Sequence, residues 1–293
     1  MKEKYFYIEP QIAHQLLDQV KNMAWSKRGI DCHAYLVDDY AVLSTNRIML
    51  RNVTTRDEDL YYFDELIETL WNLYQHGISV VPILGYCYDP DSINGTGYIF
   101  QKRAKGQELF DDAVLAKFQI WAQSQLENLY LQSCLSKAEE IEYLLSRTYE
   151  ISQIPQGHFN KFVSDMICIL EKDILIDCFG RSNFFYDKDE GFQFIDLDAH
   201  NDYKYGLTNQ KPDIEGIVSV CGFTPCHYAA DSQILSEGAL DEQALLALTP
   251  CQRSELAEAN KKVLLKCIAA LRENGISEAA INKSLSQVKI YGC

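Results

Sequence analysis

Polar side chains suited to binding a metal ion lie on both sides of a stretch that predicts a β-hairpin, residues 184–197. Asp177 and Asn183 precede this stretch, and Asp196 stands at its end. Because a hairpin brings its outer ends together, we expect Asn183 and Asp196 to meet at one edge, with Asp177 on the loop leading in. Two carboxylates and an amide oxygen are hard ligands of the kind that Mg²⁺ uses when it also binds substrate phosphates. The stretch therefore predicts a magnesium site.

The hairpin is predicted by its pattern of apolar and polar residues. Phe184, Phe185 and Tyr186 form an apolar run, and residues 187–191 form a polar turn that contains a glycine. The second run, 192–197, alternates in polarity. Two short runs around a glycine-containing turn indicate antiparallel strands.

This stretch resembles the catalytic segment of protein-kinase-like phosphotransferases, in particular the aminoglycoside and choline kinase branch. The resemblance implies that Asp177 is the catalytic base or hydroxyl-orienting residue, and that Asn183 and Asp196 bind the metal ion. Two features depart from the family pattern. Leu175 stands where the family usually has a histidine, and the spacing from Asp177 to Asn183 is one residue longer. Both departures favour the alternative of an inactive pseudokinase.

The first third of the chain predicts short strands, one long helix and further strands. The predicted strands are residues 33–37, 40–43, 47–53, 78–85 and 97–106. The predicted helix, residues 57–76, has apolar residues at helical spacing, and Gly77 ends it. This order matches the small lobe of a kinase-like fold.

The resemblance also implies a phosphate-binding cation on the strand before the long helix. In one register this residue is Arg51, with Glu65 as the helix carboxylate that pairs with it and Glu68 as the reserve. In the alternative register Ser44 takes the position, which leaves no cation there, and Arg47 is a further candidate. Both registers remain open from the sequence.

The segment from Gln101 to Ala104 corresponds to the hinge whose backbone contacts the nucleotide base in the family. Gln101, Arg103 and Ala104 are therefore the expected base-binding residues. No glycine-rich G-x-G-x-x-G loop is present, and residues 26–29 provide only one glycine for a loop over the phosphates.

The rest of the chain predicts mainly helices. They span residues 115–130, 137–149, 155–170, 241–248, 253–274 and 277–287. We therefore expect an α+β, bilobal, protein-kinase-like fold, with a β-rich nucleotide-binding lobe at 1–104 and a helical catalytic and substrate lobe at 105–293.

Composition limits the classes of partner. The net charge of −15 disfavours nucleic acid, whose phosphates need basic side chains, and weakly favours a cationic substrate. No apolar run approaches the ~18 residues of a membrane span, so no membrane association is expected. The polar start and ten cysteines without a C-x-x-C pair favour a cytoplasmic protein with reduced thiols.

The functional hypothesis is an ATP- or GTP-dependent, Mg²⁺-dependent phosphotransferase that acts on a hydroxyl of a small molecule, including a cationic one such as an aminoglycoside. The alternatives are a pseudokinase that binds nucleotide or protein without transfer, a protein serine/threonine kinase, and an unrelated α+β protein. The acceptor, the nucleotide preference and the oligomeric state are not determined by the sequence.

Overall fold

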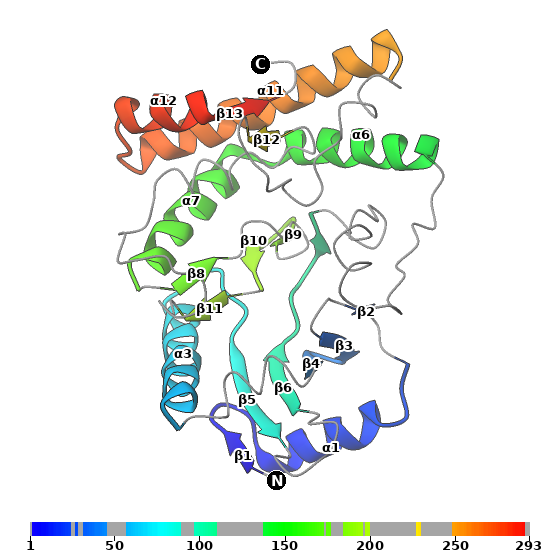
Figure 1. The fold of residues 1–293 in the computed structure, drawn as a ribbon, viewed down its shortest axis with the longest axis vertical. Helices are drawn as coiled ribbons and strands as arrows, with labels where there is room; N and C mark the ends of the chain where they lie inside the picture. Colours follow the sequence, from blue (N-terminus) through cyan, green and yellow to red (C-terminus); the bar gives the residue numbers. More distant parts are fainter. Residues whose placement is uncertain are drawn as a thin grey trace. The chain divides into compact units, whose positions relative to one another are not determined.

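The structure is a computed structural model of the chain (Figure 1). It describes residues 2–24, 27–28, 32–45, 57–88, 97–109, 137–172, 174–176, 184–195, 197–199, 227–229 and 248–290. The described helices are α1 (Pro10–Val20), α3 (Asp57–Gln75), α6 (Lys137–Gln153), α7 (Gln156–Leu170), α11 (Pro250–Glu273) and α12 (Glu278–Gln287). The strands up to residue 108 are β1 (Lys2–Tyr5), β2 (Lys27–Arg28), β3 (Cys32–Val37), β4 (Tyr40–Thr45), β5 (Ile83–Tyr88), β6 (Gly97–Lys102) and β7 (Gln107–Glu108). The later strands are β8 (Ile174–Ile176), β9 (Phe184–Asp187), β10 (Gly191–Phe194), β11 (Leu197–Ala199), β12 (His227–Ala229) and β13 (Val288–Ile290).

The chain forms two compact units. The first contains Met1–Lys105, Lys172–Leu175 and Gln193–His200, and the second contains the remaining segments. The first unit holds a six-stranded sheet in the order β1-β5-β6-β4-β3-β2, whose pairings are antiparallel. The second is mainly helical in its described residues. The predicted α+β fold class, with a small antiparallel sheet, one long helix and a larger helical part, is confirmed. The domain boundary at residue 104 stays a prediction.

The predicted strands at 33–37 and 40–43 form a hairpin near the β2 edge of the sheet. β3 and β4 pair from Cys32↔Thr45 to Val37↔Tyr40, and Asp38 turns the chain with a φ of 50°. Aspartate tolerates this left-handed conformation better than most residues, which is why a two-residue turn is possible here.

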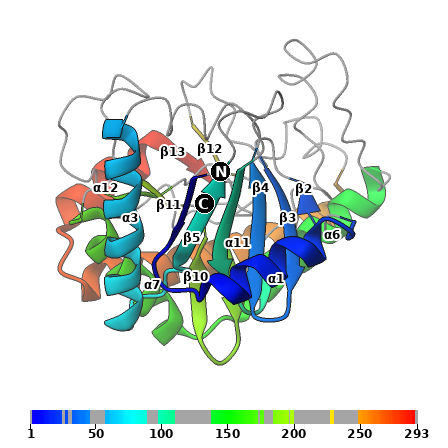
Figure 2. The same ribbon diagram turned by 90° about the horizontal axis from the view of Figure 1, so that it is seen from below.

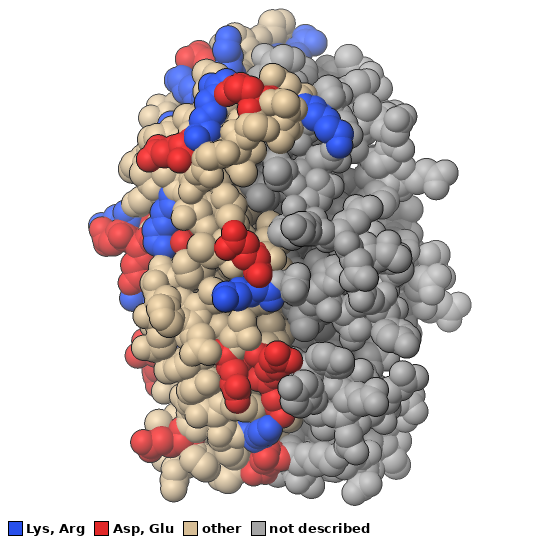
Figure 3. Space-filling model, turned by 90° about the vertical axis from the view of Figure 1, so that its left-hand side faces the viewer, with Lys and Arg blue, Asp and Glu red and all other residues tan. Residues whose placement is uncertain are grey.

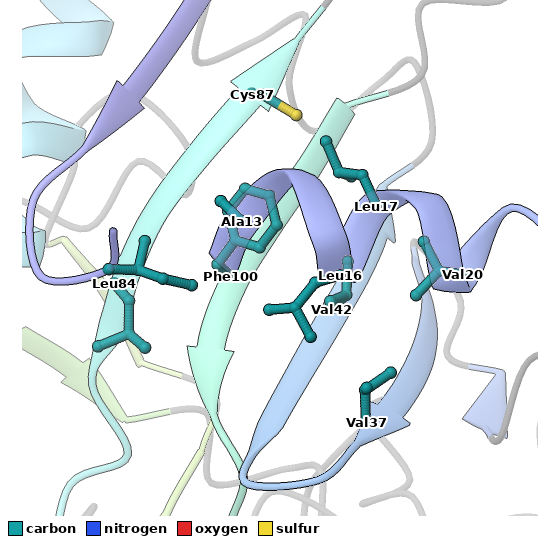
Figure 4. Close-up of a cluster of buried hydrophobic side chains, with 10 residues drawn as sticks. Ala13, Leu16, Leu17, Val20, Val37, Val42, Leu84, Cys87 and Phe100 are labelled. Carbon is teal, nitrogen blue, oxygen red and sulfur yellow. The ribbon is translucent and has the colours of Figure 1, made fainter. Parts of the chain in front are cut away.

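Helix α1 covers one face of this sheet (Figure 2). Figure 4 shows Leu16 and Leu17 of the helix directed at strand residues that include Val42 and Phe100. Val42 and Phe100 are fully buried, and they are directly paired across β4 and β6. Because neighbouring side chains in a strand point to opposite faces, Ala41 and Gln101 belong to the other face.

Helix α3 ends where the sequence predicts. Gly77 has a φ of 80°, the conformation that glycine adopts most readily after a helix. The next strand begins later than predicted, at Ile83. Pro82 has no N–H to donate, so the regular pairing with β6 starts only beyond it, while Val80 makes a single parallel bridge to Phe194.

The predicted hairpin at 184–197 is present as β9 and β10, which are neighbours in a three-stranded sheet with β7. The Asp187 carboxylate accepts hydrogen bonds from the backbone N–H groups of Asp189 (2.8 Å) and Glu190 (3.0 Å), and this stabilises the turn. In the second unit, the ring of Phe162 of α7 packs against the rings of Phe184 and Phe192, with distances between ring centres of 5.8 Å and 4.8 Å. The hairpin is thus anchored by apolar burial on α7.

Helix α11 begins earlier than predicted because Thr249 and Gln252 form a reciprocal capping box around its first turn. Helices α6 and α7 both pack against it. Strand β1, a short edge strand that pairs with β5, was not predicted from the sequence. The predicted strand at 47–53 and the predicted helix at 115–130 lie outside the described residues. The predicted helix at 241–248 lies outside them as well, except for its last residue, Leu248, which is in a bend before α11.

On the described part of the face in Figure 3, basic and acidic side chains are interspersed and form no large patch of one charge. None of the described helices has the length and apolar character needed to cross a bilayer.

Candidate nucleotide and phosphate site

The segments that flank two of the predicted site residues are neighbours in the structure. β8 ends at residue 176, directly before Asp177, and β11 starts at residue 197, directly after Asp196. These two strands form a two-stranded sheet. Asp177, Asn183 and Asp196 themselves lie outside the described residues, so their roles stay predictions.

The side chain of Gln101 links two backbone segments of this region. It is only 6% exposed, and its Nε2 group lies 3.1 Å from the carbonyl oxygen of Val81 and 3.1 Å from that of Ile195. Ile195 directly precedes Asp196. A buried amide with two good acceptors is stabilising, and it restrains the backbone that leads into Asp196. The sequence indicated Gln101 for its backbone, and only the structure revealed this role of its side chain.

The backbone N–H groups of the predicted hinge are mostly used within the protein. Lys102 donates to the Pro82 carbonyl (3.1 Å) and Arg103 to the Asp39 carbonyl (2.9 Å). Among the described residues, none accepts a hydrogen bond from the Ala104 N–H. Ala104 is partly exposed, so this donor is the one in the segment best suited to a ligand.

Two further contacts hold the segment of the predicted hinge in place. Gln193, which the sequence pattern marked only as the polar position of a strand, is 8% exposed, and its Oε1 accepts a hydrogen bond from the Lys105 N–H at 2.9 Å. The guanidinium of Arg103 donates to the Asp38 carbonyl at 3.2 Å. Arg103 therefore ties the hinge to the β3–β4 turn. The available sequence signal for Gln193 was a glutamine between two phenylalanines in a short predicted strand.

β6, which leads into the predicted hinge, lies between β5 and β4, and β3 pairs with the other edge of β4. Ser44 lies on β4 opposite Tyr98, on the same face as Val42. Residues 40–45 include no lysine or arginine. Arg47 and Arg51 lie outside the described residues.

The sequence predicted that Glu65 of α3 pairs with a cation, but in the structure it is the neighbouring Asp64 whose carboxylate forms an ion pair and a hydrogen bond. Asp64 forms an ion pair with Lys4 and accepts a hydrogen bond from the Tyr86 hydroxyl at 3.1 Å. Burial, followed by the nearby Asp64 charge, raises the pKa of Tyr86. The Glu65 side chain is exposed, and within the described part of the chain it forms no ion pair. Its pairing with Arg51 stays a prediction.

A metal site built entirely from described residues is absent, because none of them form a group of three or more histidine, cysteine, aspartate or glutamate side chains. The magnesium prediction therefore depends on Asn183 and Asp196. Their carboxylate and amide oxygens have the hard-ligand chemistry that Mg²⁺ requires.

No protein-family model matches the chain, and no curated protein matches its sequence. Several solved structures are similar to it. One is the ROP18 kinase domain in complex with AMP-PNP and sucrose, with a TM-score of 0.39 and 13% identity, over 89% of this chain and 81% of that chain. Another is WbdD, with a TM-score of 0.36 and 10% identity, over 90% of this chain and 50% of that chain. A third is WaaP in complex with acyl carrier protein, with a TM-score of 0.36 and 12% identity, over 98% of this chain and 99% of that chain. Because these identities and TM-scores are low, the functional assignment depends on this chain's own residues.

Proposed function

We propose that the protein is an ATP- or GTP-dependent, Mg²⁺-dependent phosphotransferase that moves a terminal phosphate to a hydroxyl group of a small molecule. The observation that carries this proposal is the pairing of β8 with β11, which makes neighbours of the segments that flank Asp177 and Asp196. Two carboxylates next to the ends of neighbouring strands suit phosphoryl transfer, in which one carboxylate orients the acceptor hydroxyl and the other binds the metal ion.

The residues have separate tasks in this proposal. Asp177 would accept a hydrogen bond from the acceptor hydroxyl and hold it in line with the phosphate. Asp196 and Asn183 would hold Mg²⁺, which neutralises charge on the phosphates when bound. Ala104 would donate its backbone N–H to the nucleotide base. Gln101 would keep the backbone before Asp196 in place through Ile195.

Arg51 and Glu65 are the proposed cation and carboxylate next to the phosphates, as the resemblance implies. The acidic net charge of −15 supports a cationic acceptor such as an aminoglycoside, because it attracts cations towards the protein. A protein serine or threonine is the alternative acceptor.

A second function is favoured by the composition of β4. This strand, one of the two that pair with β6, carries Ala41, Val42, Leu43 and Ser44 and no basic residue. If residues 46–56 supply no cation in its place, the protein would bind nucleotide without transferring phosphate, as a pseudokinase does.

The test compares wild type, Asp196→Ala and Asp189→Ala. Asp189 lies exposed in the turn of the same hairpin, so its loss controls for removal of a carboxylate. We expect ATP with Mg²⁺ to raise the melting temperature of wild type and Asp189→Ala, and phosphate transfer to a panel of hydroxylated small molecules to require Asp196. Metal-independent stabilisation without transfer would favour the pseudokinase, and no response to any nucleotide would contradict both functions.

A further inference from the structure

The guanidinium of Arg147, on α6, holds the backbone of the segment that follows the predicted hinge. Its Nε group donates to the Leu109 carbonyl at 3.1 Å, and Nη2 donates to the Glu108 carbonyl at 2.5 Å. Nη1 forms an ion pair with Glu150, and the Arg147 side chain is only 15% exposed. Because the donors of a guanidinium form a rigid fork, contacts with two successive carbonyls restrain both peptide groups together.

The segment that Arg147 holds has little regular structure of its own. β7 is two residues long and forms one edge of its three-stranded sheet. It pairs with β9 only through Gln107↔Tyr186 and Glu108↔Phe185. A strand this short makes few hydrogen bonds to its neighbour, so its position depends strongly on the side chains that contact its backbone.

Leu109 carries this restraint to the first residue of β9. The Leu109 side chain is fully buried, and its backbone N–H donates to the Phe184 carbonyl at 2.9 Å. The ring of Phe184 is 1% exposed and packs on Phe162 of α7. Phe184 is therefore held through its carbonyl by Leu109 and through its ring by α7. The residue before Phe184 is Asn183, the proposed metal ligand, so these contacts restrain the backbone on which Asn183 stands.

We propose that Arg147 is a positioning residue for the metal site, which acts on Asn183 through residues 108–109 and Phe184. This inference rests on the proposed Mg²⁺-dependent function and adds a residue that raises the affinity for Mg²⁺ without being a ligand. Groups that orient a metal ligand typically change metal affinity by about 10- to 100-fold when they are removed. Arg147 acts over more steps, so a smaller effect is expected.

The test measures binding of ATP or GTP, whichever wild type binds, by titration calorimetry. The quantity compared is the metal enhancement, the ratio of the dissociation constant in EDTA to that with Mg²⁺. We expect Arg147→Met to lower the metal enhancement by about three- to tenfold, while the dissociation constant in EDTA stays within about twofold of wild type. General damage to the fold would instead weaken binding in both conditions. An unchanged metal enhancement in folded Arg147→Met overturns the inference.

Two variants control for loss of charge and for loss of stability. Arg272→Met removes another arginine of the helical unit, one that pairs with Glu278 in an exposed position, and it should leave the metal enhancement unchanged. Arg147→Lys keeps the charge, but one ammonium group does not reproduce the fork, so we expect a fall of about two- to fivefold. If Arg147→Met does not fold, this variant decides, and wild-type metal enhancement in Arg147→Lys overturns the inference.

A double-mutant cycle tests the route through Asn183. Asn183→Ala should lower the metal enhancement, and adding Arg147→Met to it should change the value by less than about twofold, because the ligand that Arg147 positions is already gone. A full further fall overturns the route. If nucleotide binding by wild type does not depend on metal, the proposed function fails and this inference fails with it. Metal-dependent binding that Arg147→Met leaves unchanged overturns this inference alone.

Discussion

The ammonium group of Lys266 lies 2.7 Å from the carbonyl oxygen of Ser152, one of the last carbonyls of α6. It also donates to the Ile154 carbonyl at 2.5 Å and lies 5.8 Å from the centre of the Phe159 ring. Burial lowers the pKa of Lys266, as expected for a cation taken partly out of water. One side chain of α11 thus satisfies the C-terminal end of α6.

We predict that Lys266→Met lowers the free energy of unfolding by about 1–3 kcal/mol, because it leaves these carbonyls without a donor. The matched control is Lys262→Met on the same helix. Lys262 forms only an exposed pair with Glu258 at 3.1 Å, so its loss should change stability by no more than about 0.5 kcal/mol. Urea denaturation followed by circular dichroism measures both, and equal effects would contradict the capping role.

Gly106, which follows the hinge, has no room for a side chain. Its φ is 78°, and an added Cβ would lie 2.1 Å from the Tyr186 carbonyl oxygen. Backbone cannot move aside as a flexible side chain can, so we predict that Gly106→Ala destabilises the protein by about 3 kcal/mol or more. Gly157→Ala is the matched control. Nothing lies within 4 Å of its added Cβ and it stands in α7, so we expect a neutral or slightly stabilising effect in the same thermal melts. Similar melting temperatures for the two variants would contradict the prediction.

The buried thiol of Cys87 makes stability depend on alkaline pH. Burial in the apolar cluster under α1 raises its pKa to about 12 from an ordinary value of 9.0. The folded state therefore keeps its proton at pH values where the unfolded state loses it. The stabilising contribution is present in full below pH 9.0 and is lost as the pH rises towards about 12.

The measurement compares the free energies of unfolding of wild type and Cys87→Ala at several pH values. We expect the advantage of wild type to be constant from pH 6 to 8 and then to shrink by up to about 1.4 kcal/mol per pH unit above pH 9. The other cysteines are common to both proteins, so their titration cancels in the difference. A difference that does not change up to pH 10.5 would show that the thiol is not shielded.

Substitutions at Ala104 test whether the predicted hinge binds the nucleotide base through its backbone. Ala104→Pro removes the backbone N–H that has no acceptor among the described residues, and we predict about three- to tenfold weaker ATP binding from the loss of one hydrogen bond. Ala104→Gly keeps the N–H and should bind ATP within about twofold of wild type. Titration calorimetry gives both constants, and melting temperatures check that the proline variant remains folded. Unchanged affinity in the folded proline variant would exclude this N–H from base binding.

The sequence by itself determined the elements whose signals are local. The hairpin at 184–194, the end of α3 at Gly77 and the strand pair around Asp38 follow from turn residues and from apolar periodicity, which depend on near neighbours in the chain. The edge strand β1 pairs with β5, and Val80 forms an isolated bridge with Phe194. Both pairings depend on partners far along the chain, so no local pattern indicates them.

The same distinction holds for the candidate site. Residue types alone were enough to predict Asp177, Asn183 and Asp196 as a set, and those roles stay predictions. Only the tertiary structure decided that β8 and β11 are neighbours, and that β6 lies between β5 and β4. It also decided that the Gln101 amide spans the carbonyls of Val81 and Ile195. The physical reason is that pairing between distant strands and the orientation of a buried amide are set by contacts across 20 to 94 residues of sequence, which periodicity within one element does not encode.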